Sequence, residues 1–115
     1  MTSDISASRG LARWLAANRT SFACSSYQTG QLILVGSHND GAVAISRCAF
    51  DRVMGMAWRP GRLYLAARQE IWRMENILPP GACDDSGHDA LLVPRNAQVT
   101  GDIDAHEVGV TPQGQ

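Results

Sequence analysis

The residues best suited to chemistry lie near the C-terminus, within residues 101–106. If this segment is extended, Asp102, Asp104 and His106 project from one face at i, i+2 and i+4. Two carboxylates and an imidazole could bind a divalent cation or act as an Asp-His acid–base pair. The alternative is structural: the side chains hold a loop by hydrogen bonds to backbone groups. Metal sites normally need more ligands than this segment supplies, so Asp102, Asp104 and His106 are weak metal candidates and are retained as ligand-binding candidates.

Arginines form a second set of candidates, and all ten basic residues of the chain are arginines. The set is Arg68, Arg73 and Arg95. Arg68 ends a predicted strand and Arg95 follows an apolar run, and these two could face a central channel. There they would clamp a carboxylate or phosphate through bidentate contacts. The alternative is a salt bridge from an arginine to Asp102 or Asp104 that joins neighbouring structural units, as most arginine contacts are structural.

Other segments give weaker signals. Residues 83–89 are rich in Cys, Asp and His, but their spacing fits no standard metal-ligand pattern and they follow a turn signal. No phosphate-binding loop, nucleophile elbow or zinc-protease motif occurs. We therefore expect no cofactor.

Composition excludes several classes of protein. The chain has 115 residues, 44% of them hydrophobic and 18% charged, with a net charge of −1. That balance is globular and offers no basic field for nucleic acid or an anionic membrane. Three widely spaced cysteines predict reduced thiols, and with no apolar N-terminal signal the expected location is the cytoplasm.

The hydrophobic pattern predicts one short helix followed by short strands. Leu11, Trp14 and Leu15 form an apolar stripe at helical spacing. From Ser21 onward, turn signals separate runs that favour strands. The helix is expected over residues 8–18 and the strands over residues 22–27, 31–37, 42–50, 53–58, 62–68, 71–75 and 106–110.

An internal repeat with an offset of 31 residues supports this pattern. Residues 30–36 align with residues 61–67, and both stretches carry a turn glycine followed by Leu-x-Leu. An aromatic residue precedes each turn, Tyr27 in one copy and Trp58 in the other. Residues 111–115 repeat the turn a third time. The sequence thus predicts successive copies of one β-unit.

The repeated strands are apolar on both faces, which predicts stacked sheets. Leu32 and Leu34 point one way while Ile33 and Val35 point the other. Small meandering sheets that stack around an axis are the blades of a propeller. The fold class expected is all-β: an incomplete antiparallel meander of β-propeller type with one short N-terminal helix. A strand at 106–110 would be an unpaired edge, so self-association through unpaired edge strands is expected.

Four segments together resemble one family of bacterial conserved hypothetical proteins, a domain of unknown function that is propeller-like. The segments are residues 27–32, 50–57, 71–76 and 100–107. Their order covers most of residues 22–110, and the chain resembles the N-terminal third of family members. The resemblance implies a fold and no catalytic residues, because the family has no established activity.

The chain divides on this basis into an N-terminal segment and a partial propeller. Residues 1–20 carry the short helix, and residues 21–115 hold the propeller part. We expect its first repeat at about 21–50, its second at about 51–77, a loop at 78–90 and the start of a third at about 91–115.

Three functional hypotheses follow. The first is a ligand-binding or protein-interaction module, with Arg68, Arg95, Asp102, Asp104 and His106 as the ligand-binding candidates. The absence of a catalytic motif favours it over an enzyme. The second is a propeller enzyme, a metal-assisted hydrolase or lyase that uses Asp102, Asp104 and His106. The third is a non-functional gene fragment. The partner expected is a small molecule or a protein, and neither nucleic acid nor membrane.

Overall fold

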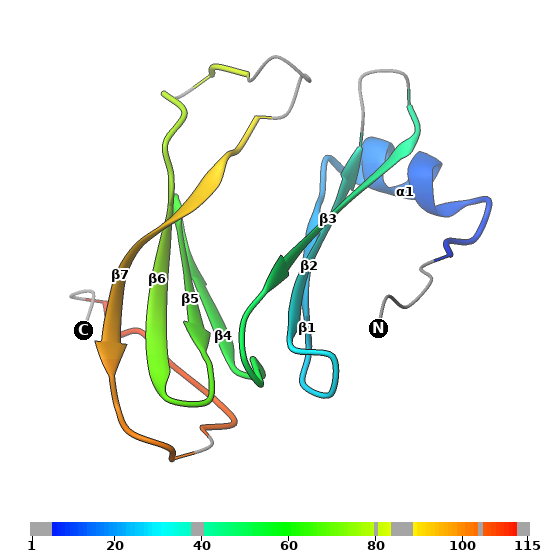
Figure 1. Cartoon of the computed structure of the whole chain (residues 1–115). Coiled ribbons are helices and arrows are strands. Elements are labelled where there is room, and N and C mark those ends of the chain that lie inside the picture. The colour runs from blue at the N-terminus through cyan, green and yellow to red at the C-terminus, as the bar shows by residue number, and fades with distance from the viewer. Residues whose placement is uncertain (1–5, 38–40, 80, 84–88, 104, 113–115) are drawn as a thin grey trace.

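The computed structural model describes residues 6–37, 41–79, 81–83, 89–103 and 105–112. Within these residues, seven strands in two antiparallel sheets follow one short helix (Figure 1). The elements are α1 (Leu11–Asn18), β1 (Phe22–Ser26), β2 (Gln31–Ser37), β3 (Val43–Ala49), β4 (Met56–Arg59), β5 (Arg62–Ala66), β6 (Glu70–Asn76) and β7 (Leu92–Val99). The predicted all-β meander with one N-terminal helix is therefore confirmed.

Sheet A has the strand order β1-β2-β3 and is held by two hairpins. The turn between β1 and β2 ends at Gly30, which has a φ of 64°. That left-handed conformation favours glycine, and it explains why glycine recurs at each repeated turn. The carbonyl of Gly30 accepts a hydrogen bond from the Phe50 N–H at 2.9 Å, which extends the β2–β3 ladder beyond Ala49.

Sheet B has the strand order β4-β5-β6-β7. Pro60 and Gly61 make the tight β4–β5 turn, and Gly61 has a φ of 78°. β7 pairs with β6, although we expected a third repeat to begin near residue 91. The strand at 92–99 is thus the fourth strand of sheet B, while the division of the chain into repeats stays a prediction.

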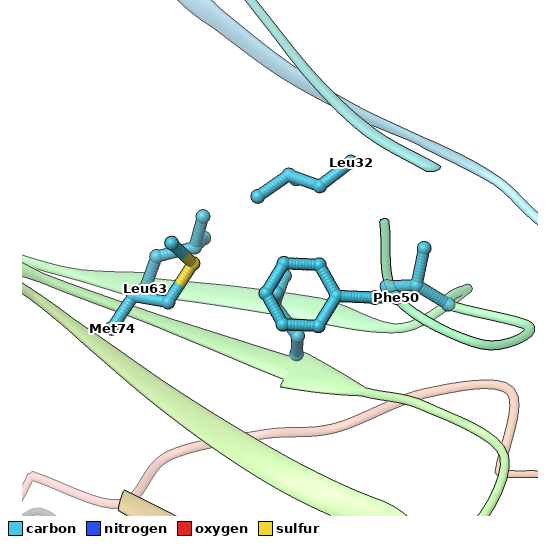
Figure 2. Close-up of a cluster of buried hydrophobic side chains, with 6 residues drawn as sticks. Leu32, Phe50, Leu63 and Met74 are labelled. Atoms are coloured by element: carbon cyan, nitrogen blue, oxygen red, sulfur yellow. The ribbon is translucent and has the colours of Figure 1, made fainter. Parts of the chain in front are cut away.

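The main core lies where the two sheets face each other. Leu32 reaches from sheet A toward Phe50, Leu63 and Met74, as Figure 2 shows. These side chains are 0–9% exposed. Burying a side chain of this size stabilises a fold by about 1.5–3 kcal/mol. Shared burial therefore joins the two sheets into one unit.

Helix α1 packs beside sheet A, and Leu15 is its one fully buried residue. The Trp14 ring stacks on Phe22 of β1 with ring centroids 5.6 Å apart. The helix begins at Leu11 and not at residue 8, because Gly10 and not Ser8 occupies the N-cap position, where no side chain makes a capping hydrogen bond. The helix lies against β2, and the spacing of Leu11, Trp14 and Leu15 predicts an apolar stripe on one of its faces.

The strand expected at residues 106–110 does not form. Residues 105–112 have no regular secondary structure, because a strand needs a neighbouring strand to bind its backbone groups. The segment instead runs beside β4: a Cβ placed on Gly55 would lie 2.6 Å from the Glu107 Cα, and an Arg59 guanidinium NH2 donates to the Val110 carbonyl at 3.3 Å. We refer to residues 105–110 as the C-terminal segment.

Candidate functional site

Arg68 lies in the β5–β6 turn, between two carboxylates. Its Nε is 3.1 Å from Asp102 Oδ2, and its NH1 is 3.9 Å from Asp51 Oδ2. Its backbone N–H also donates to the Asp51 carbonyl at 2.8 Å. The three side chains are 37–69% exposed, so the ion pairs contribute about 0–1 kcal/mol each. This is the structural alternative that the sequence left open for Arg68 and Asp102.

A concavity of about 550 Å³ lies next to Arg68. Phe50 and Trp72 contribute aromatic walls and meet edge to face, with centroids 5.7 Å apart. Asp51 and Glu70 line the same concavity, and together with Arg68 they leave it a formal surplus of one negative charge. Such a site suits a neutral or cationic group better than the anion that we expected Arg68 to bind.

The structure does not assemble an Asp-His pair from Asp102 and His106. Asp102 pairs with Arg68, whereas the His106 ring lies against Tyr27, with centroids 6.4 Å apart and planes at 55°. Asp104 lies outside the described residues. Among the residues that the structure describes, no three His, Cys, Asp or Glu side chains gather as a metal-binding group.

Arg95 contacts a carboxylate that it shares with two other arginines, and Arg68 is not one of them. Its Nε is 3.9 Å from Glu75 Oε2. Two further arginines contact the other oxygen of this carboxylate: Arg62 Nε at 3.2 Å and Arg73 Nε at 3.4 Å from Oε1. We refer to Arg62, Arg73, Arg95 and Glu75 as the arginine cluster.

The sheet register explains why these side chains meet. Arg62 lies opposite Glu75 across β5 and β6, and Arg73 lies two residues from Glu75 on the same face. Leu63 and Met74 point to the core, so this outer face of sheet B is turned away from sheet A. Arg95 reaches it because the β6–β7 register shifts after Arg73 and leaves Arg95 as the extra residue of a β-bulge.

The cluster carries more cations than its carboxylate can neutralise. Glu75 is 26% exposed and serves three guanidinium groups that are 38–57% exposed. Arg59 adds a fourth, because it lies directly opposite Arg62 across β4 and β5. Like charges opposed in this way are destabilising. The four guanidinium groups and one carboxylate leave a formal surplus of three positive charges on this face.

The excess of donors is visible at the Nε atom of Arg73. Its Nε is buried and makes no hydrogen bond to the described residues. The 3.4 Å contact with Glu75 is therefore an ion pair without hydrogen-bond geometry. A buried donor left unpaired costs about 1–3 kcal/mol, a cost that an added acceptor would remove.

A second concavity of about 420 Å³ adjoins Arg73 on the outer face. Tyr64, Arg73, Asn96 and Gln98 line it from sheet B, and residues 108–110 of the C-terminal segment close one side. It offers guanidinium, amide and phenol groups together. A molecule that occupies it would contact polar donors on the sheet and backbone on the segment.

Sequence reasoning named Arg73 and Arg95 but missed Arg62 and Glu75. Alternation along the strand puts Arg62 on the face opposite Leu63 and Leu65, and this signal could have found it. Glu75 could not be identified as the partner of Arg62, because the length of the β5–β6 loop sets which residues face each other. This length differs between the two repeats: residues 38–42 join β2 and β3, whereas residues 67–69 join β5 and β6.

The fold and the cluster together define an all-β protein of two stacked antiparallel sheets with a cationic site on its outer face. The chain belongs to the family described as Domain of unknown function (DUF4915), whose profile matches residues 9–115. The four sequence segments predict membership of a domain family of unknown function, and this is confirmed. The bacterial and propeller-like character of the family stays a prediction.

No curated protein and no solved structure gives a significant match to the chain. Across the described residues, no helix has the length and apolar character needed to cross a membrane.

Proposed function

We propose that this protein is a binding module whose arginine cluster on the outer face of sheet B holds an anionic ligand. The observation that carries the proposal is the contact of Arg62, Arg73 and Arg95 with the single carboxylate of Glu75. The ligand class is a carboxylate or phosphate group, on a small molecule or on a protein surface.

The chemistry of guanidinium supports this ligand class. Arginine presents a planar fork of donors that matches two oxygens of a carboxylate or phosphate. The contacts with Glu75 are made through Nε in each case. An oxyanion beside Arg73 would relieve the repulsion among the arginines and supply an acceptor to this crowded face.

The acid–base alternative has less support in the described residues. Asp102 is paired with Arg68 and His106 lies against Tyr27, so the two side chains serve different neighbours. Arg68 is likewise compensated by two carboxylates. Of the ligand-binding candidates that the structure describes, Arg95 has the surroundings that best favour an anion.

We also propose that the two sheets are blades of a propeller. Sheet B is a four-stranded antiparallel meander, as propeller blades are, and sheet A stacks on its inner face.

Cys24, Cys48 and Cys83 are free thiols. Free thiols support a site of action in the cytoplasm, where they stay reduced.

Titration calorimetry with sodium phosphate and with citrate, at constant ionic strength, tests the anion site. Arg62→Gln and Arg95→Gln should each weaken binding about tenfold, the loss expected for one charge-assisted hydrogen bond. Arg13→Gln is the matched control, because Arg13 is exposed on α1 and its replacement removes the same charge elsewhere.

The control separates a site from a general charge effect. Equal weakening by Arg13→Gln would show that net charge alone attracts the anion. Failure of both phosphate and citrate to bind the unmodified protein would overturn the proposal. Binding of one and not the other would identify the geometry of the oxyanion.

A further inference from the structure

The described parts of the two sheets have four strand edges, and three of them carry features that discourage pairing. β7 contains Pro94, Arg95 and a bulge, all of which protect an edge. β4 has four residues and is flanked by the C-terminal segment. β1 has five residues, and its Ser25 hydroxyl donates to the Met54 carbonyl at 2.7 Å, which places the β3–β4 connection against it.

β3 is the exception. It has seven residues, no proline and one charged side chain, Arg47. Ile45, Ser46 and Arg47 are exposed, and Ile45 is 38% exposed. Within the described residues, β2 is the one strand that pairs with β3. A long edge of this kind, with little charge, is a template for another strand.

The hydrogen-bond pattern between β2 and β3 shows which backbone groups of β3 point away from β2. The Phe50 N–H bonds to the Gly30 carbonyl, and bonded pairs alternate along an antiparallel ladder. Cys48, Ser46 and Ala44 therefore bond to β2, in register with Leu32, Leu34 and Gly36. The N–H and C=O groups of the alternate residues point away from β2. These outward residues are Val43, Ile45, Arg47 and Ala49.

The internal repeat shows how such an edge is completed. β2 and β5 are equivalent strands, so β3 in sheet A corresponds to β6 in sheet B. β7 occupies the outer edge of β6 along seven residue pairs. The equivalent position beside β3 is open in the described chain, although the strand length is the same.

The edge of β3 is complementary to itself. Two antiparallel copies centred on Ser46 pair Val43 with Ala49 and Ile45 with Arg47, which uses every outward residue. Arg47 then faces Ile45 of the other copy, and no like charges are directly opposed. A twofold centred on Arg47 would oppose Arg47 to Arg47, which charge repulsion disfavours. A twofold centred on Ile45 would place Ala49 opposite Gly41, which lies outside β3. Charge and strand length together therefore favour the centred register.

We propose that the protein forms a twofold dimer in which the β3 edges of two copies pair antiparallel about Ser46. The result is a continuous six-stranded sheet, with β1-β2-β3 from each copy. The contact is isologous, as in most symmetric dimers. It is independent of the anion site, which lies on the other sheet.

Proline and alanine at position 47 test the proposal. Arg47→Pro removes an outward N–H and leaves the β2 ladder intact, a substitution that edge strands tolerate. Arg47→Ala removes the same side chain and keeps the N–H. Sedimentation velocity of the whole chain over a hundredfold range of concentration, with far-UV circular dichroism of each variant, measures assembly and fold together.

We expect the unmodified protein and Arg47→Ala to sediment as dimers at the upper concentrations. Arg47→Pro should weaken dimerisation at least tenfold while its circular dichroism stays unchanged. A protein that is monomeric throughout would overturn the proposal, as would an Arg47→Pro variant that dimerises normally.

A second variant covers the case in which Arg47→Pro unfolds. Ile45→Lys places a second cationic side chain directly opposite Arg47 of the other copy in the centred register, where like charges repel. It should therefore favour the monomer while the fold of each copy is kept. Normal dimerisation of folded Ile45→Lys would overturn the centred register and the proposal with it.

Discussion

Glu75 controls the electrostatics of the outer face of sheet B. One carboxylate lies among Arg62, Arg73 and Arg95, and it is less exposed than any of them. It both stabilises the folded cluster and competes with any anion for the same guanidinium groups. Removing the charge of Glu75 should therefore affect anion affinity and the stability of the fold in opposite directions.

Glu75→Gln should strengthen phosphate binding and weaken the fold. The substitution keeps the shape of the side chain and removes its charge, so the arginines lose their internal anion and attract an external one more strongly. We expect a several-fold tighter phosphate affinity by calorimetry and a loss of about 1 kcal/mol in the free energy of unfolding by urea titration. The loss of stability should shrink when phosphate is added.

A purely structural cluster predicts otherwise. In that case Glu75→Gln would lower stability with no gain in phosphate affinity, and added phosphate would not restore it. Glu70→Gln is the matched control, because Glu70 lies on the same strand but lines the concavity on the other side of the sheet.

At the scale of single elements, the sequence predicts the strands well and their partners less well. The Leu-x-Leu repeats and their turn glycines locate β2 and β5 because alternation and positive φ are local properties. The register of β4 against β5 differs by two residues from that of β1 against β2. The difference arises because residues 27–30 join β1 and β2, whereas only residues 60–61 join β4 and β5. As a result, Trp58 lies within a strand while its counterpart Tyr27 lies in a turn.

The candidate site shows the same division. Its residue type makes Arg95 a ligand-binding candidate, but its neighbours depend on a bulge in β7 that no local pattern encodes. The Asp102 and His106 prediction assumed an extended strand through residues 102–106. The described part of that segment has no strand, because no strand of the described chain pairs with it there.

Gly55 directly precedes β4 and lies close to the C-terminal segment. A Cβ at this position would meet Glu107 backbone atoms at 2.6–2.9 Å. Gly55→Ala must therefore displace the segment, and we expect a loss of about 1–3 kcal/mol in unfolding free energy. Gly109→Ala is the control in the same segment, since a Cβ there meets nothing within 4 Å. Equal stability of the two variants, measured by urea unfolding, would show that the segment does not pack beside β4.

At the scale of the whole molecule, the two sheets share one hydrophobic core, which bears on whether they unfold cooperatively. The buried cluster includes Leu32 from sheet A and Leu63, Leu65 and Met74 from sheet B. Neither sheet has another large group of buried side chains among the described residues. The sheets should therefore unfold together, because separating them exposes the core of both.

Two single-tryptophan variants test this cooperativity. One retains Trp14, which stacks on Phe22 beside sheet A, and the other retains Trp72 of sheet B, with the remaining tryptophans replaced by Phe. Within each variant, the guanidinium transition seen by fluorescence should coincide with that seen by far-UV circular dichroism. Adding Leu32→Ala should lower stability by about 2–5 kcal/mol in both backgrounds. If Leu32→Ala shifts the Trp14 transition and leaves that of Trp72 unchanged, the two sheets are separate folding units and the shared core does not join them.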